Sequence, residues 1–408
     1  MHMVMWAMSD RTLPRSLRMM EGFGVHSFRL LNAAGESTFV KFHWRPKLGI
    51  QSTVWDEAVK LQSADNDFHR RDLFESIEAG DFPEWELSVQ LFTDEDAQDF
   101  PFDHLDPTKL IPEELIPLQP VGRMVLNRWP DNFFAETEQV AFCPANVPPG
   151  IDFSNDPLLQ GRLFSYLDTQ LSRLGGPNFA QIPINAPKCP FHNNQRDGHM
   201  QMQVPKGRVN YEPSSLQADS PRASQALGFR HFAQADDGVK GRVRAESFAD
   251  HYSQARMFYR SQSPLEQAHM ASATVFELSK VGTPHVREAV VGHLQHVDAE
   301  LAQRVADGLG MQALPPAPPT VEPVQDLPLS PALRIIDRMK PTLQGRCVGI
   351  LVADGSNGTS VASLRKALEK AGATVKIVAP KVGGAVLKGG TLLPADGQLA
   401  GTPCVVFD

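Results

Sequence analysis

The chain has 408 residues, a net charge of −8 and a sequence pI of about 5.9. This length is enough for two or three domains with buried cores. The acidic balance, without any run of lysine or arginine, excludes a nucleic acid as the main partner and favours a small one.

The cysteines and the hydropathy pattern bear on the compartment. The four cysteines are scattered without close pairing, at Cys143, Cys189, Cys347 and Cys404. No apolar stretch reaches the length of about 18 residues that a membrane helix needs. We therefore expect a soluble, cytoplasmic protein without membrane contact. Both chain ends resemble the interior of a domain, and residues 404–408 resemble a strand, so we expect a piece of a longer protein.

The first part of the chain, residues 1–174, combines strand and helix patterns. His26, Phe28 and Leu30 alternate on one face, and a histidine in such a setting is more often a core residue than a functional one. The acidic stretch 94–117 favours a solvated loop. The patterns predict a hairpin from 25–31 and 39–44, strands at 87–92 and 121–126, and helices at 54–62, 68–80 and 132–142.

One helix face in the run Gly161–Gln170 carries unusual chemistry. At 100° per residue, with Arg162 at zero, Tyr166 lies at about 40° and Arg173 at about 20°. This face fits a solvated polar stripe, or alternatively an anionic phenol held by positive charge. Asp156 stands where a carboxylate caps the start of the helix.

Residues 175–262 have little apolar periodicity and are too long for an ordinary loop, so we expect a segment that wraps around a neighbouring subunit. Cys189, His192 and His199 in this segment suggest a metal site. The set lacks a fourth ligand and the paired spacing of zinc sites, which disfavours that interpretation.

The remaining chain divides into three parts. Ser263 and Glu266 form a capping box that opens a helical bundle over 263–312, with a second helix along 286–305. Prolines make 313–343 an extended linker. Residues 344–408 predict a strand, helix, strand unit of a parallel sheet. Its turn, Asp354–Thr359, could hold phosphate, although an ordinary turn fits its spacing better.

The run Arg162-Leu163-Phe164-Ser165-Tyr166-Leu167-Asp168-Thr169-Gln170 is similar to the haem-ligand signature of monofunctional catalases, in which a tyrosine binds the iron. The similarity extends over residues 2–312 and is clearest at 20–26 and 161–178. The proline linker and the following α/β unit resemble the large-subunit catalases, which carry a C-terminal flavodoxin-like domain. The resemblance implies an α+β fold with an incomplete antiparallel β-barrel.

The resemblance also assigns residues. It implies that Tyr166 is the haem ligand, that Arg162 bonds its phenolate, that His26 and Asp156 extend this network, and that Arg173 contacts a haem propionate. It implies a homotetramer that converts hydrogen peroxide to oxygen and water in protection against oxidative stress.

Two departures qualify this expectation. Cys143 stands where some large-subunit members have a histidine beneath the tyrosine, so a histidine partner is in doubt. The distal histidine and asparagine of catalases precede the position that matches Met1. We therefore expect little activity from this chain by itself. The alternative is a non-catalytic haem-binding or structural part of a catalase-like assembly.

Overall fold

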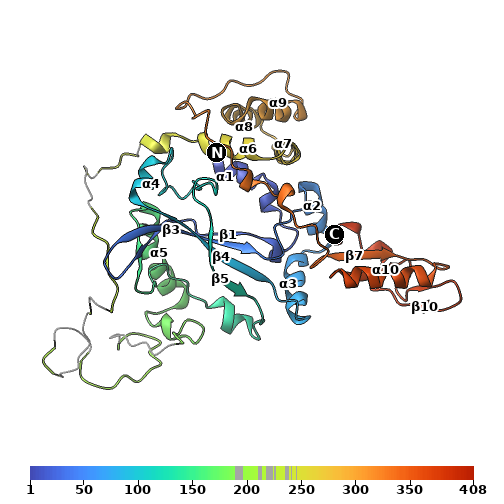
Figure 1. Cartoon of the computed structure of the whole chain (residues 1–408), viewed down its shortest axis with the longest axis horizontal. Helices are drawn as coiled ribbons and strands as arrows, with labels where there is room; N and C mark the ends of the chain where they lie inside the picture. Colours follow the sequence, from blue (N-terminus) through green and yellow to red (C-terminus); the bar gives the residue numbers. More distant parts are fainter. Residues whose placement is uncertain are drawn as a thin grey trace.

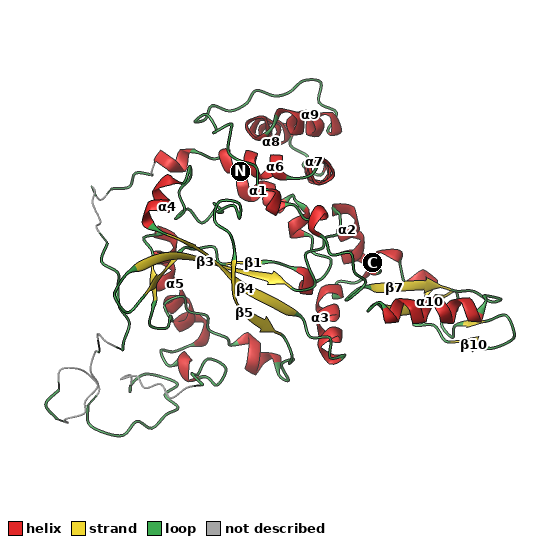
Figure 2. Cartoon of the chain, in the orientation of Figure 1, coloured by secondary structure: helices red, strands yellow, loops and turns green. Residues whose placement is uncertain are grey.

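The computed structural model describes residues 1–188, 196–209, 214–216, 224, 227–234, 239, 241–244 and 246–408. Its centre is an antiparallel sheet with the strand order β5-β4-β3-β2-β6, and β1 pairs with β3 (Figures 1 and 2). The strands are β1 (Gly22–Phe23), β2 (Phe28–Leu31), β3 (Ser37–Pro46), β4 (Glu84–Phe92), β5 (Gln119–Val125) and β6 (Ile151–Phe153). Helices and an antiparallel sheet confirm the α+β class, whereas closure into a barrel stays a prediction.

The predicted hairpin is confirmed as β2 and β3. Phe28 pairs with Val40 and Leu31 pairs with Ser37, so the register follows the alternation of the sequence. Gly35 turns the loop at a φ of 86°, a left-handed conformation that glycine adopts without strain. His26 lies just before β2 rather than within it.

Two of the three helices predicted in this part are confirmed, as α2 (Trp55–Ala64) and α3 (Phe68–Glu78). The helix predicted at 132–142 is wrong, because only Phe134–Glu138 forms a short π-helical turn. The Glu136 side chain accepts hydrogen bonds from the Asp131 and Asn132 amides, and these local bonds compete with a continued helix.

The acidic stretch 94–117 is not a solvated loop. It begins with helix α4 (Asp94–Asp99), and Ile111 packs with Phe39 and Phe92 against the sheet. Gln90 of β4 donates hydrogen bonds to the carbonyls of Ile111 and Ile116. Scattered apolar residues among the acidic ones therefore anchor this segment over one face of the sheet.

A second core lies in the helices. The helices α6 (Ser253–Ser261), α7 (Pro264–Ser279), α8 (Pro284–Val297) and α9 (Ala299–Gly308) gather beside α1 (His2–Ala7) (Figure 1). The capping box at Ser263 is confirmed. The single helix predicted along 286–305 is instead two helices, because the Asp298 carboxylate caps α9 through the amides of Glu300 and Leu301.

The proline-rich segment, all of which the structure describes, forms no α-helix or strand, but it contains the short 3₁₀ turns Pro331–Leu333 and Ile336–Arg338 and is held against the helices. The buried Glu266 carboxylate accepts hydrogen bonds from the amides of Ile335 and Ile336, at 2.6 and 3.2 Å. The Pro316 carbonyl lies 2.7 Å from where a Cβ on Gly292 would stand, so only glycine allows this approach. The segment therefore follows the surface of the helical core.

The C-terminal part forms the predicted parallel unit. Strand β7 (Cys347–Leu351) pairs in parallel with β8 (Thr374–Ala379), and α10 (Gly358–Lys370) connects them. A short strand β11 (Gly397–Gln398) adds to β8, and β9 (Ala385–Val386) pairs with β10 (Leu392–Leu393). The expected strand at 404–408 is wrong, because Cys404–Val406 is a 3₁₀ turn. The flavodoxin-like assignment stays a prediction.

The turn Asp354–Thr359 is tied to the neighbouring hairpin. The Asp354 carboxylate pairs with Lys381 at 2.6 Å and accepts the Val386 amide, and Leu387 packs close to Gly358. These contacts favour an ordinary turn over a phosphate site. In the described residues, no helix is long and apolar enough to cross a bilayer.

Buried imidazoles make the stability of this fold sensitive to acid. Burial lowers the pKa of His2, His43 and His104 from 6.5 to about 4. Between these values the unfolded chain binds more protons than the folded one, so the stability falls as the pH decreases from 6.5 to 4. For the almost fully buried His2 the loss is about 3 kcal/mol.

Urea unfolding at a series of pH values between 7 and 4.5 measures this loss. We expect His43→Gln to flatten the pH dependence and His285→Gln, on an exposed side chain, to leave it unchanged. A free energy of unfolding that is constant over this pH range would contradict the lowered pKa values of these histidines.

Candidate functional site

The site is built on helix α5 (Pro157–Leu174). Pro157 occupies the first helical position, and Gly175 ends the helix at a φ of 82°. The Asp156 carboxylate caps the start, with Oδ1 accepting the amides of Leu158 and Leu159 at 2.8 and 3.1 Å. The predicted capping role of Asp156 is therefore confirmed.

Tyr166 and Arg162 meet on one face of α5. The Arg162 Nη2 atom donates a hydrogen bond to the Tyr166 phenolic oxygen at 2.7 Å. The guanidinium carbon also lies 4.9 Å from the centroid of the phenol ring. Spacing of four residues brings the two side chains to the same side of the helix. Both are half-buried, so this pair has less contact with solvent than a fully solvated polar stripe would have.

His26 and Asp156 form a second pair, at the start of α5. The His26 Nδ1 atom lies 2.5 Å from Asp156 Oδ2, and both side chains are buried. Asp156 therefore caps the helix with one carboxylate oxygen and holds the imidazole with the other. The other ring nitrogen, His26 Nε2, is buried without a hydrogen-bond partner among the described residues.

Arg173 lies on the same face of α5 but bonds to other groups than Tyr166. Its guanidinium donates hydrogen bonds to the carbonyls of Glu138 and Val140, at 2.8 and 2.5 Å, and to the Gln170 side chain at 2.6 Å. These bonds attach the irregular segment before β6 to α5. The side chain remains exposed, so the contact with a carboxylate ligand stays a prediction.

All five predicted residues therefore lie on α5 or contact it. Four of them form two hydrogen-bonded pairs, and the fifth, Arg173, bonds a neighbouring segment to the helix. Within the described part of the chain, no hydrogen bond joins the pair of His26 and Asp156 to the pair of Arg162 and Tyr166. The continuous network that the resemblance implies therefore stays a prediction, and the structure shows the two pairs as separate hydrogen-bonded units.

Sequence reasoning missed three exposed apolar side chains, one on α5 and two on segments that are hydrogen-bonded to it. Val25, Leu158 and Phe142 are 48%, 52% and 76% exposed. Val25 precedes the anchored His26, and Leu158 stands at about −40° on the same helical wheel as Arg162. The Gln170 amide donates to the Phe142 carbonyl at 3.0 Å. Only Leu158 could have been found from helix spacing, because the others arrive from distant segments.

Cys143 follows Phe142 in this approach and is a half-buried free thiol. Among the described residues, no cluster of histidine, cysteine and acidic side chains could hold a metal ion. Cys189 and His192 of the suggested metal set lie outside the described residues.

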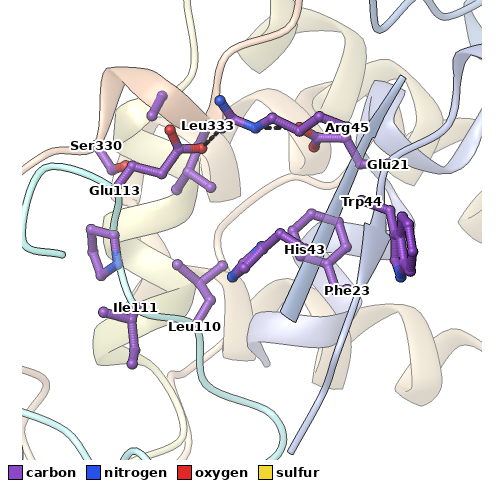
Figure 3. A pocket seen from close by; sticks show the side chains of 13 residues that line it. Glu21, Phe23, His43, Trp44, Arg45, Leu110, Ile111, Glu113, Ser330 and Leu333 are labelled. Atoms are coloured by element: carbon purple, nitrogen blue, oxygen red, sulfur yellow. Dashed lines mark hydrogen bonds and ion pairs between the residues drawn. The ribbon is translucent and has the colours of Figure 1, made fainter. Parts of the chain in front are cut away.

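Two cavities lie elsewhere in the protein, and Tyr166 lines neither of them. One has a volume of about 30 Å³ and lies beside β1 and β3, where Leu333 and Ser330 close it and Arg45 pairs with Glu113 (Figure 3). It has room for about one water molecule. A cleft of about 570 Å³ separates α3 from the face of β8 that carries Lys376.

Removal of the Asp156 carboxylate should weaken the whole site. We expect Asp156→Ala to cost about 3 kcal/mol, because it removes a helix cap and one partner of a buried pair. Asp156→Asn should cost less, because asparagine also caps helices well. Urea unfolding monitored by circular dichroism measures both values, and equal costs for the two variants would contradict the capping role.

A family model described as "Catalase" matches residues 1–218, and a model described as "Catalase-related immune-responsive" matches residues 245–309.

Three relatives match over the full length of the chain. It is 59% identical to "Catalase C" of Rhizobium meliloti, 54% identical to "Catalase HPII" of Pseudomonas putida and 50% identical to "Catalase-2" of Bacillus subtilis. In each case all of this chain is covered, together with 58%, 58% and 59% of the respective relative. The chain therefore spans a little over half the length of these relatives, and it belongs to the catalase family, with relatives of the large-subunit type.

Proposed function

We propose that this chain supplies the tyrosine side of a haem site in a catalase that converts hydrogen peroxide to oxygen and water. The observation that carries the proposal is the hydrogen bond from the Arg162 guanidinium to the Tyr166 phenolic oxygen on one face of α5. A peroxide molecule is small and neutral, so the site needs no large charged pocket for its substrate.

The residues present fit a haem group. An anionic phenolic oxygen is a suitable ligand for ferric iron, and the Arg162 guanidinium would stabilise such an anion by charge and by hydrogen bonding. Leu158, which is exposed and lies on the same side of α5 as Arg162, offers apolar contact to a flat macrocycle. Arg173 offers a cation to a haem carboxylate. Bound haem would supply the redox-active iron at which peroxide reacts.

The other residues of the site orient the ligand. Asp156 fixes the first turn of α5 and anchors His26, so the helix that carries Tyr166 is attached to the strand segment before β2. Arg173 attaches the segment 138–140 to the same helix. We propose that the whole protein assembles as a homotetramer in the cytoplasm, in protection against oxidative stress.

The replacement Tyr166→Phe tests the ligand directly. It removes the oxygen atom that would bind iron and keeps the ring, so we expect the haem absorbance to disappear or to change its band positions. Absorption spectra of the purified proteins measure this effect. Asp168→Asn, on an exposed part of the same helix, is the matched control and should keep the spectrum of the unmodified protein.

Oxygen release from peroxide, measured with an oxygen electrode, separates the two functional candidates. If the full-length protein is a catalase, it releases oxygen from peroxide. If it is a non-catalytic haem-binding or structural protein, it shows the haem absorbance but releases no oxygen. We expect little oxygen release from the 408-residue chain alone.

A normal haem spectrum in Tyr166→Phe would contradict the assignment of Tyr166 as the haem ligand.

A further inference from the structure

Gln170 is a buried polar residue near the end of α5 that the proposed function does not use. It is 4% exposed, although its neighbours Thr169 and Leu171 face solvent. Buried polar groups in proteins are almost always hydrogen-bonded. Gln170 meets this requirement at both ends of its carboxamide, because Nε2 donates to the Phe142 carbonyl at 3.0 Å and Oε1 accepts from Arg173 Nη2 at 2.6 Å.

The Arg173 guanidinium has five N–H groups, and three of them are bonded within the chain. One Nη1 proton is donated to the Glu138 carbonyl at 2.8 Å, and the two Nη2 protons are donated to the Val140 carbonyl at 2.5 Å and to Gln170. The Nε proton and the second Nη1 proton have no partner among the described residues. Because the side chain is exposed, these two N–H groups remain for a ligand.

The segment that accepts these bonds is also held from a second direction. Asn185 Oδ1 accepts the Ala141 amide at 2.8 Å, and Asn185 Nδ2 donates to the Gln139 carbonyl at 2.9 Å. Asn185 belongs to the chain beyond α5, so it fixes the segment independently of this helix. The carbonyls of the segment therefore define where the Arg173 guanidinium lies.

We propose that Gln170 is a positioning residue, which orients the Arg173 guanidinium so that its free Nε and Nη1 protons meet a carboxylate of the ligand that Tyr166 binds. This role rests on the proposed function, in which that ligand is haem. The carboxamide oxygen accepts a hydrogen bond without adding a negative charge. Arg173 therefore keeps its full charge for the ligand, whereas a glutamate at this position would neutralise it.

The orientation of Arg173 matters because a mobile side chain must be ordered when a ligand binds, which lowers the affinity. Three hydrogen bonds already order Arg173 in the chain without a ligand. Loss of the Gln170 carboxamide removes one of them and also releases the Phe142 carbonyl from α5. The affinity for a ligand with a carboxylate should then decrease more than the affinity for the same macrocycle without one.

The first test compares haem with haem dimethyl ester, which has the same macrocycle and no free carboxylate. Absorption titrations of the 408-residue chain give a dissociation constant for each compound, and the ratio of the two constants measures the carboxylate contact. We expect the unmodified chain to bind haem about tenfold more tightly than the ester. Gln170→Met, which loses both hydrogen bonds, should decrease this preference, and Gln170→Glu should reduce it to about one.

Gln160→Glu is the matched control. It also removes a bond between a glutamine and a carbonyl, and it places the same charge on the same helix about 15 Å away. This variant should leave the preference for haem over the ester unchanged. Tyr166→Phe should weaken the binding of both compounds alike. If the two Gln170 variants also weaken both compounds alike, Gln170 has only a structural role and the proposal is overturned.

The second test needs no haem. NMR of the chain labelled with ¹⁵N-arginine reports how fast each guanidinium rotates, and the signal of Arg173 is the one that disappears in Arg173→Lys. We expect slow rotation in the unmodified chain and in Gln160→Glu, and faster rotation in Gln170→Met. An unchanged rotation rate in Gln170→Met would refute the role of Gln170. If Gln170→Met does not fold, Gln170→Asn, whose carboxamide is one methylene group shorter, replaces it in both tests.

The two proposals fail separately. If the chain binds haem through Tyr166 with a preference over the ester that does not depend on Gln170, only the role of Gln170 is lost. If Gln170 controls the rotation of Arg173 in a chain that binds neither compound, only the proposed function is lost.

Discussion

The buried pair of His26 and Asp156 joins the two parts of the molecule on which the site depends. Asp156 caps α5 with one oxygen and holds His26 with the other. His26 in turn belongs to the segment that leads into β2, next to the carbonyl held by Lys41. Because a carboxylate buried without partners is strongly unfavourable, the helix amides and His26 together stabilise the buried Asp156. The orientation of the Tyr166 face relative to the sheet follows from this arrangement.

Charge is distributed unevenly along this helix. Its start carries the buried negative charge of Asp156, and the next turns carry Arg162 and, near the end, Arg173. The first arginine bonds the phenol and the second bonds backbone carbonyls, so both cations have structural partners before any ligand binds. An anionic phenol and a ligand carboxylate would each meet a cation that is already in place. This preorganisation supports a haem site rather than a solvated surface.

Local sequence patterns predicted much of the fold. The features that were not predicted depend on contacts between residues far apart in sequence. The hairpin, the cap at Asp156 and the capping box at Ser263 depend on neighbouring residues and were confirmed. The packing of the acidic segment 94–117 and of the proline-rich segment 313–343 was not predicted. Elements far away in sequence bury Ile111 of the first segment and Ile335 of the second. For the same reason, spacing predicted that Arg162 lies beside Tyr166, whereas the hydrogen bond from Gln170 to the Phe142 carbonyl required the structure.

The proposed bond from the Tyr166 oxygen to haem iron can be tested by resonance Raman spectroscopy of the haem-loaded chain, prepared with unlabelled and with ring-deuterated tyrosine. If Tyr166 is the ligand, phenolate vibrations shift with the label and vanish in Tyr166→Phe. A spectrum without label-sensitive phenolate bands, in a protein that binds haem, would contradict it.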